Sequence, residues 1–284
     1  MELIAIDMDG TLLNSQNTIS QENIKAIKKA QEMGTEVVIA TGRAEFDVRQ
    51  ILANTDLNTW VIGANGATIH QPNGTLFHSV PIEEKDAAEI LEWLDEKQFY
   101  YEVFSDSSIL TPQNGRALLQ MELDRIQSAN PNEEIEKLTA ALEKQFSQTG
   151  FYHVDSYQEI LEAGAPIYNV LAFSFEQEKL DLGWESFQSY PNLTLVSSAH
   201  HNFELEHKNA SKGIALQKLS THLGLSMDRT GAIGDSPNDL SMISMASHSA
   251  AMENGRPVVK EASDFVTKSN DDDGVAHTIY HWLK

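Results

Sequence analysis

The stretch Glu2-Leu-Ile-Ala-Ile-Asp7-Met-Asp9-Gly-Thr-Leu-Leu13 decides the fold of this chain. Its apolar residues are followed at once by two acids and a glycine. A short apolar run of this kind is typical of a strand buried on both faces, and the polar residues after it predict a loop. We therefore expect a buried strand over residues 2–6 that ends just before Asp7.

Helices and further apolar strands alternate after this stretch. Ser20 is a suitable N-cap for a first helix, and residues 35–40 have the composition of a second buried strand. A helix near 44–53, a strand at 60–62 and a hairpin over 66–79 are expected next. Strands that alternate with helices imply right-handed crossovers and a doubly wound parallel sheet.

The pattern changes in the middle of the chain, where β-rich runs and helical stretches no longer alternate one by one. Helices are expected at 83–97, 115–129, 132–147 and 177–189, and strands at 99–104, 108–111, 167–174, 193–198 and 202–206. This order is typical of a mostly antiparallel sheet with helices on one face. The sequence therefore predicts a second, α+β domain inserted within the first.

The parallel pattern resumes near residue 208. Ser211 is a suitable N-cap for a helix, an apolar strand follows, and Pro237 opens another helix at its first position. We therefore expect an α/β fold, with a doubly wound parallel-sheet core formed by residues 1–82 and 208–284 and an inserted domain formed by residues 83–207.

The charge balance argues against nucleic acids and membranes as partners. The chain has 284 residues, with 42 Asp and Glu against 20 Lys and Arg and a formal charge of −22. Such a surface repels polyphosphate backbones and anionic lipid leaflets. We expect neither a transmembrane helix nor a signal peptide, and the absence of cysteine fits a reducing cytoplasm. A cytoplasmic protein is expected, and its oligomeric state is left open.

Polar side chains follow the strands of the predicted core. In a doubly wound sheet, ligands bind outside the carboxyl ends of the strands, so residues just after each strand are the candidates for a site. Converging carboxylates form the all-oxygen site that Mg²⁺ prefers, and the sequence therefore predicts a magnesium site. The candidates are Asp7 and Asp9 after the first strand, Thr41 after the second, and Asp235, Asn238 and Asp239 after the strand near residue 230.

Lys212 suggests that the site does more than bind a metal. It lies in the first turn of the helix after Ser211, where the helix dipole disfavours a cation by about 0.3–1 kcal/mol. A nearby carboxylate and a phosphate would explain this placement, because the ammonium offsets their mutual repulsion. Thr41 offers a hydroxyl and neighbouring backbone N–H groups to phosphoryl oxygens.

Four segments together resemble a known family. Asp7-Met-Asp-Gly-Thr-Leu-Leu13, Thr41-Gly-Arg43, Ser211-Lys-Gly213 and Gly234-Asp-Ser-Pro-Asn-Asp239 are similar to the four ordered motifs of the haloacid dehalogenase superfamily. Within it they resemble the Cof-type phosphatases, which carry a large α+β cap domain. The resemblance covers nearly the whole chain and implies that the inserted domain is this cap.

The resemblance also implies a role for each motif residue. Asp7 would be the nucleophile that forms an aspartyl-phosphate, and Asp9 would be the general acid for the leaving alcohol and then the base for water. Mg²⁺ would be held by Asp7, the backbone carbonyl of Asp9 and Asp235, with Asp239 in support. The transferring phosphoryl group would be held by Thr41, Lys212 and Asn238.

The predicted activity is Mg²⁺-dependent hydrolysis of a small phosphorylated metabolite, with a sugar phosphate as the expected substrate. Two other functions stay open. A phosphotransferase or phosphomutase would use the same chemistry on another acceptor, and a non-catalytic sensor would only bind a phosphorylated ligand. Asp9 argues against the sensor, because binding alone has no use for a general acid.

Simpler structural interpretations exist for single residues. Asp235 and Asp239 stand at the start of the helix that Pro237 opens, where acids are favourable, so their simpler interpretation is helix capping. Arg43 is expected to pair with Glu45 or Asp47 rather than with substrate. Asn65 and Gly66 are candidates to line the site, although an Asn-Gly pair is more typical of a simple turn.

Overall fold

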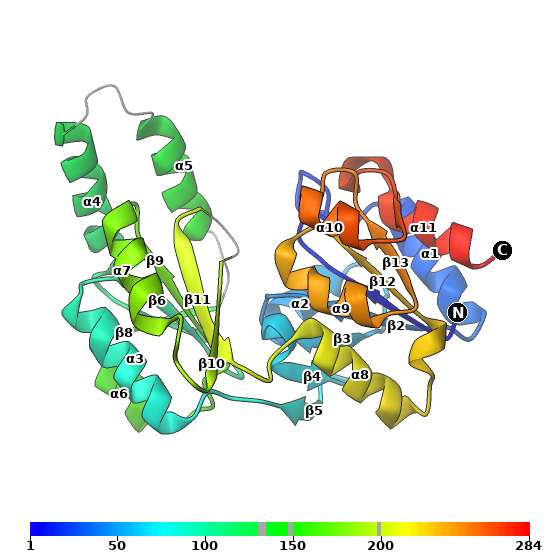
Figure 1. Ribbon diagram of the computed structural model, residues 1–284, viewed down its shortest axis with the longest axis horizontal. Coiled ribbons are helices and arrows are strands. Elements are labelled where there is room, and N and C mark those ends of the chain that lie inside the picture. Colours follow the sequence, from blue (N-terminus) through cyan, green and yellow to red (C-terminus); the bar gives the residue numbers. More distant parts are fainter. Residues whose placement is uncertain (130–134, 147–149, 198–199) are drawn as a thin grey trace. The chain divides into compact units, whose positions relative to one another are not determined.

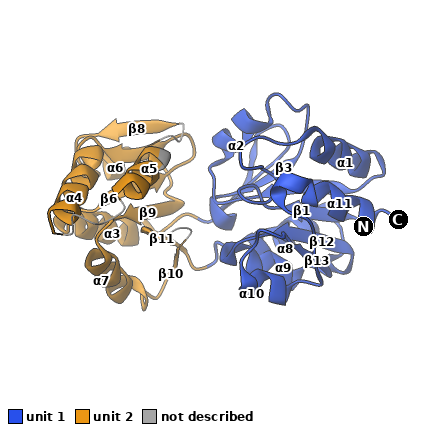
Figure 2. Ribbon diagram, turned by 90° about the horizontal axis from the view of Figure 1, so that it is seen from above, with its two compact units in different colours: residues 1–80, 209–284 blue, residues 81–208 orange. Residues whose placement is uncertain are grey.

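The computed structural model describes residues 1–129, 135–146, 150–197 and 200–284. Within them the chain divides into two units, which are coloured separately in Figure 2. Unit 1 combines Met1–Val80 with Asn209–Lys284, and unit 2 is Pro81–Lys208. The chain therefore leaves unit 1 once and returns to it once.

Unit 1 is built on an eight-stranded sheet with the order β14-β13-β12-β1-β2-β3-β4-β5. Neighbouring strands from β14 to β3 are parallel, whereas β4 and β5 form an antiparallel hairpin at one edge. The strands are β1 (Leu3–Ile6), β2 (Glu36–Ala40), β3 (Trp60–Gly63), β4 (Thr68–His70), β5 (Leu76–Ser79), β12 (Thr230–Gly234), β13 (His248–Ala251) and β14 (Phe265–Val266).

Helices cover both faces of this sheet, as Figure 1 shows. Side chains alternate along a strand, so Ile4 and Ile6 pack on one face against α1, α2 and α11. Leu3 and Ala5 pack on the other face against α8, α9 and α10. The predicted doubly wound core is confirmed. Its helices are α1 (Gln21–Glu32), α2 (Glu45–Leu52), α8 (Lys212–Leu223), α9 (Leu240–Met245), α10 (Pro257–Ala262) and α11 (Gly274–Trp282).

Unit 2 contains a six-stranded sheet with the order β10-β11-β9-β6-β7-β8. Its strands are β6 (Tyr100–Phe104), β7 (Ile109–Pro112), β8 (Phe151–Val154), β9 (Asn169–Phe173), β10 (Leu193–Val196) and β11 (Asn202–His207). Its helices are α3 (Glu84–Glu96), α4 (Gly115–Ala129), α5 (Ile135–Gln145), α6 (Tyr157–Glu162) and α7 (Gln177–Phe187). Across the described residues of both units, no helix combines the length and the apolar character needed to cross a membrane.

Two elements of unit 2 were not expected from the sequence. β8 pairs in parallel with β7 and is followed by the short helix α6, whereas all other strand pairs of this sheet are antiparallel. β8 exposes Tyr152 and His153, so it lacks the buried apolar run that identified the other strands. Of the helix expected over 132–147, α5 covers Ile135–Gln145, and residues 132–134 and 147 lie outside the described residues.

The expectation that the helices of unit 2 lie on one face of its sheet was wrong. Tyr101 and Val103 of β6 pack in the core formed with α3, α6 and α7. Tyr100 points to the opposite face, where its ring contacts Gly115 at the start of α4 so closely that a Cβ there would lie 2.4 Å from it. Gln145 at the end of α5 donates to Glu102 on that same face over 2.8 Å. α4 and α5 therefore cover the second face.

Candidate functional site

Three neighbouring strands of unit 1 bring their carboxyl ends together. β1 lies between β12 and β2, and Ile6 at its end is in register with Ile233 and Ile39. Asp7 and Asp235 follow β1 and β12 and are therefore placed side by side. Carboxylate oxygens of Asp7, Asp235 and Asp239 all lie within 4.8 Å of one another. Among the described residues this is the one group of three or more His, Cys, Asp or Glu side chains close enough to share a metal ion.

Asp239 is oriented by the turn that follows β12. Its Oδ2 accepts hydrogen bonds from the backbone N–H groups of Asp235, at 2.9 Å, and Ser236, at 3.0 Å. The capping interpretation of Asp239 is therefore correct, and it is also incomplete. Its other oxygen, Oδ1, accepts from the Lys212 ammonium, so one fully buried carboxylate stabilises the turn and faces the site.

Lys212 is the cation at the centre of this group. It begins α8, whose N-cap Ser211 accepts from the backbone N–H of Ile214. Its Nζ donates to Oδ1 of Asp7 over 2.7 Å and to Oδ1 of Asp239 over 2.6 Å, and its side chain is 0% exposed. Burial alone would lower the pKa of Lys212, yet the two carboxylates raise it above its ordinary value. The lysine therefore stays charged.

The carboxylates outnumber the cation. Burial and the nearby charge of Asp239 raise the pKa of both Asp7 and Asp235, although Lys212 acts in the opposite direction on Asp7. Three carboxylates and one ammonium leave two negative charges when all are ionised. A divalent cation with oxygen ligands would balance this charge, so the donor set fits Mg²⁺.

Asp9 lies apart from this group of carboxylates. Its side chain is 53% exposed and forms a two-point ion pair with Arg43, whose Nε and Nη2 each donate over 2.7 Å. Nη1 of Arg43 donates to Asp47 over 2.5 Å. The expected pairing of Arg43 with a nearby acid is therefore correct for Asp47, and the pairing with Asp9 was missed because these residues are far apart in sequence. Glu45 instead pairs with Arg49.

Thr41 and Asn238 are connected through Asn65. Thr41 is 1% exposed, and its backbone carbonyl accepts from the N–H of Asn65 over 2.9 Å. Nδ2 of Asn238 donates to Oδ1 of Asn65 over 3.0 Å. Oδ1 of Asn238 is buried and has no hydrogen-bond partner within the described chain. Such an unpaired acceptor is costly, and it leaves this oxygen able to accept a hydrogen bond from a further donor.

Asn65 is therefore more than the turn residue that the Asn-Gly pair indicated. It is 4% exposed with φ of +50°, and Gly66 beside it has φ of +106°. A Cβ on Gly66 would lie 2.3 Å from the backbone of Ser211, so only glycine allows this turn to approach the start of α8.

Asn254 is a further residue that the sequence analysis missed. Its Nδ2 donates to the carbonyl of Gly10 over 2.7 Å, and its Oδ1 accepts from the N–H of Asn270 over 3.0 Å. Asn254 thus supports the loop between Asp7 and Leu13. The sequence could have indicated Asn254, because it lies just beyond the carboxyl end of β13, as Asp7 and Asp235 lie beyond the ends of β1 and β12.

Comparison with known proteins gives consistent results. A family profile described as haloacid dehalogenase-like hydrolase matches residues 4–279. The chain is 52% identical over 285 residues to the phosphatase YwpJ of Bacillus subtilis (strain 168), covering 100% of both chains. It is 43% identical over 279 residues to the 5-amino-6-(5-phospho-D-ribitylamino)uracil phosphatase YwtE of the same organism, covering 98% of this chain and 97% of that protein.

The fold agrees with these relatives. The solved structure of a haloacid dehalogenase-like hydrolase from B. subtilis superimposes with a TM-score of 0.86 at 51% identity, covering 99% of both chains. The family indicated by the four motifs is therefore confirmed. With its motifs, its fold and its relatives in agreement, this chain belongs to the haloacid dehalogenase-like hydrolases and is a phosphatase of that family.

Proposed function

We propose that this chain is a Mg²⁺-dependent phosphatase that hydrolyses a small phosphorylated metabolite through an aspartyl-phosphate on Asp7. The observation that carries the proposal is the group formed by Asp7, Asp235 and Asp239, in which Lys212 pairs with Asp7 and Asp239. When all four side chains are ionised, the group has two negative charges in excess. Phosphoryl transfer depends mainly on positioning and on neutralising charge. The carboxylates supply the positioning, and Lys212 together with the bound Mg²⁺ would neutralise the charge.

Asp7 is the proposed nucleophile. Lys212 holds its Oδ1, which fixes the orientation of the carboxylate. A carboxylate oxygen of Asp7 attacks phosphorus, the bond from phosphorus to the ester oxygen breaks, and the leaving alcohol takes a proton from Asp9. Water then attacks phosphorus while Asp9 takes up its proton, which releases phosphate and restores Asp7. Positioned acid–base catalysis of this kind typically contributes about 10²–10⁴-fold.

Asp9 requires one change before it can act. Both oxygens of its carboxylate accept hydrogen bonds from Arg43, so Asp9 must release Arg43 to donate a proton to the leaving group. Its exposed side chain can make this movement without repacking the core. Arg43 would remain attached to Asp47 meanwhile.

The phosphoryl group would be bound by Thr41, Lys212 and Asn238. Nδ2 of Asn238 donates one hydrogen bond to Asn65 and has a second N–H for a phosphoryl oxygen. Lys212 supplies the positive charge beside the carboxylates. Mg²⁺, held by Asp7, Asp235 and the backbone carbonyl of Asp9 with support from Asp239, would neutralise charge on the phosphoryl oxygens.

The two units would have different roles in catalysis. In this proposal residues 1–82 and 208–284 are the catalytic core, and residues 83–207 are a cap that selects the substrate and excludes water. The relative YwtE is named for a phosphorylated ribityl compound, which supports a sugar or polyol phosphate as the substrate. The absence of cysteine supports a cytoplasmic location.

The test is phosphate release from a panel of sugar and polyol phosphates, including 5-amino-6-(5-phospho-D-ribitylamino)uracil. Wild type, Asp7→Asn and the control Asp228→Asn are compared with and without Mg²⁺. Asp228 is an exposed acid of unit 1 outside the site, so its variant controls for the loss of one charge. We expect Mg²⁺-dependent release in wild type and Asp228→Asn and none in Asp7→Asn.

Two results would contradict the proposal. Substantial release by folded Asp7→Asn would remove Asp7 as the nucleophile. Consumption of substrate without an equal amount of free phosphate would instead identify a phosphotransferase.

A further inference from the structure

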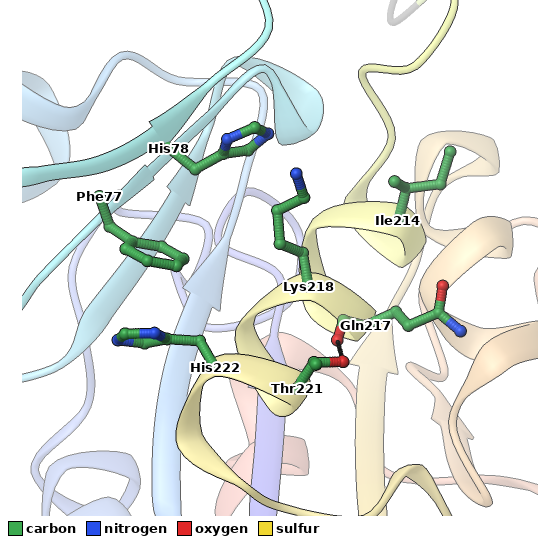
Figure 3. Close-up of a pocket in the computed structure, with 7 residues that line it drawn as sticks. All are labelled: Phe77, His78, Ile214, Gln217, Lys218, Thr221 and His222. Atoms are coloured by element: carbon green, nitrogen blue, oxygen red, sulfur yellow. Dashed lines mark hydrogen bonds between the residues drawn. The ribbon is translucent and has the colours of Figure 1, made fainter.

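A groove of about 590 Å³ lies in unit 1 between the edge strand β5 and the helix α8 (Figure 3). We call it the β5–α8 groove. It takes no part in the proposed hydrolysis. Its lining residues are Phe77 and His78 of β5 and Ile214, Gln217, Lys218, Thr221 and His222 of α8.

One wall of the groove is aromatic. The rings of Phe77 and His222 lie face to face, with centroids 4.1 Å apart and planes tilted by 33°, as Figure 3 shows. The ring of Trp60 contacts both rings edge-on, with its centroid 5.9 Å from that of Phe77 and 5.8 Å from that of His222. The three rings support one another, which gives a flat apolar surface of fixed orientation.

The rest of the groove has one positive charge and no negative charge among its lining residues. Lys218 extends from α8 toward His78, and no carboxylate lies among the lining residues (Figure 3). Among the described residues Lys218 forms no ion pair. Burial and the charge of Lys218 lower the pKa of His78, so at neutral pH this imidazole is an uncharged donor beside one ammonium. The chain has a formal charge of −22, so a groove whose lining residues include no acid differs from the acidic character of the chain as a whole.

The two elements that line the groove lie next to the points where the chain leaves and re-enters unit 1. β5 ends at Ser79, directly before the point where the chain leaves unit 1 after Val80. α8 begins at Lys212, shortly after the chain returns at Asn209. The groove therefore lies close in sequence to both points at which the chain passes between the units.

We propose that the β5–α8 groove binds a small organic anion that carries an aromatic ring and a single acidic group. The acidic group pairs with Lys218 and accepts from His78, and the ring packs against Phe77 and His222. A single acidic group fits best, because the groove holds one permanent charge and the acidic surface of the chain repels multiply charged anions.

The test uses benzoate as the probe, with benzyl alcohol and acetate as matched compounds that lack the charge or the ring. Binding is followed through the imidazole NMR signals of His78 and His222 in the full chain. The variants are Lys218→Gln and the control Lys29→Gln, an exposed lysine of α1 in the same unit.

We expect benzoate to shift both histidine signals in a saturable manner, and benzyl alcohol and acetate to bind more weakly. Loss of one charge-assisted contact should weaken benzoate binding by about tenfold in Lys218→Gln. Lys29→Gln should bind as wild type does. Histidine signals that do not move, that move equally with benzyl alcohol, or that respond alike in both variants would overturn the proposal.

Discussion

Replacing Lys212 by methionine tests the charge balance of the site directly. The substitution keeps an unbranched side chain of similar length but removes the ammonium that contacts Asp7 and Asp239 at 2.7 and 2.6 Å. Both carboxylates are buried, so they would face each other without a counter-charge. Breaking a buried ion pair from one side costs about 3–5 kcal/mol, a large share of the roughly 5–15 kcal/mol that stabilises a typical domain.

The measurement is the free energy of unfolding in urea at pH 7, with and without Mg²⁺. The pKa of Lys212 is raised in the folded state, so its contribution to stability is complete below its ordinary pKa of 10.5 and is lost only at higher pH. At pH 7 we therefore expect the full loss without metal. Mg²⁺ should restore part of the lost stability and should stabilise the variant more than it stabilises wild type. For wild type, Mg²⁺ at 100 times its Kd gives about 2.7 kcal/mol.

Lys179→Met is the matched control. Lys179 pairs with the buried Glu122 over 2.6 Å in unit 2, whereas the carboxylate group belongs to unit 1. This variant should also lose stability, but its response to Mg²⁺ should equal that of wild type. A loss below about 1 kcal/mol in Lys212→Met, or an equal response to Mg²⁺ in both variants, would refute the argument.

Two further predictions concern the same site. The raised pKa of Asp235 means that its charged form is disfavoured by folding, so Asp235→Asn should stabilise the metal-free protein at pH 7 by about 1 kcal/mol and remove most of the stabilisation by Mg²⁺. This gain in stability should vanish below the ordinary pKa of 3.8, because Asp235 is then protonated in both the folded and the unfolded chain. The measurement is urea unfolding at both pH values, and a variant less stable than wild type at pH 7 would contradict the prediction. Gly66→Ala should lower the free energy of unfolding by more than about 3 kcal/mol, because the added Cβ would lie 2.3 Å from the backbone of Ser211. Gly34 also has a positive φ, but an added Cβ there would meet nothing within 4 Å. Gly34→Ala should therefore cost only about 1–2 kcal/mol of backbone strain. Equal losses of thermal stability in the two glycine variants would show that the contact with Ser211 is unimportant.

The sequence by itself determined the fold of unit 1 and the position of its site. The apolar run of β1 and the acids after it are local features, and the rule that ligands bind beyond the carboxyl ends of parallel strands then placed Asp7, Thr41 and Asp235 at one edge. Burial on both faces makes such strands continuous in apolar character, so they are easy to identify. β8 could not be found this way, because half of its residues face solvent.

Only the tertiary structure decided which side chains pair. Asp239 contacts Lys212, Asp9 contacts Arg43, and Asn254 supports the loop before Leu13 from a distant segment. Hydrophobic periodicity reports which face of an element is buried, but it contains no information on the partner across the interface. Those partners depend on how whole elements pack, and therefore the electrostatic balance of the site could be read only from the folded chain.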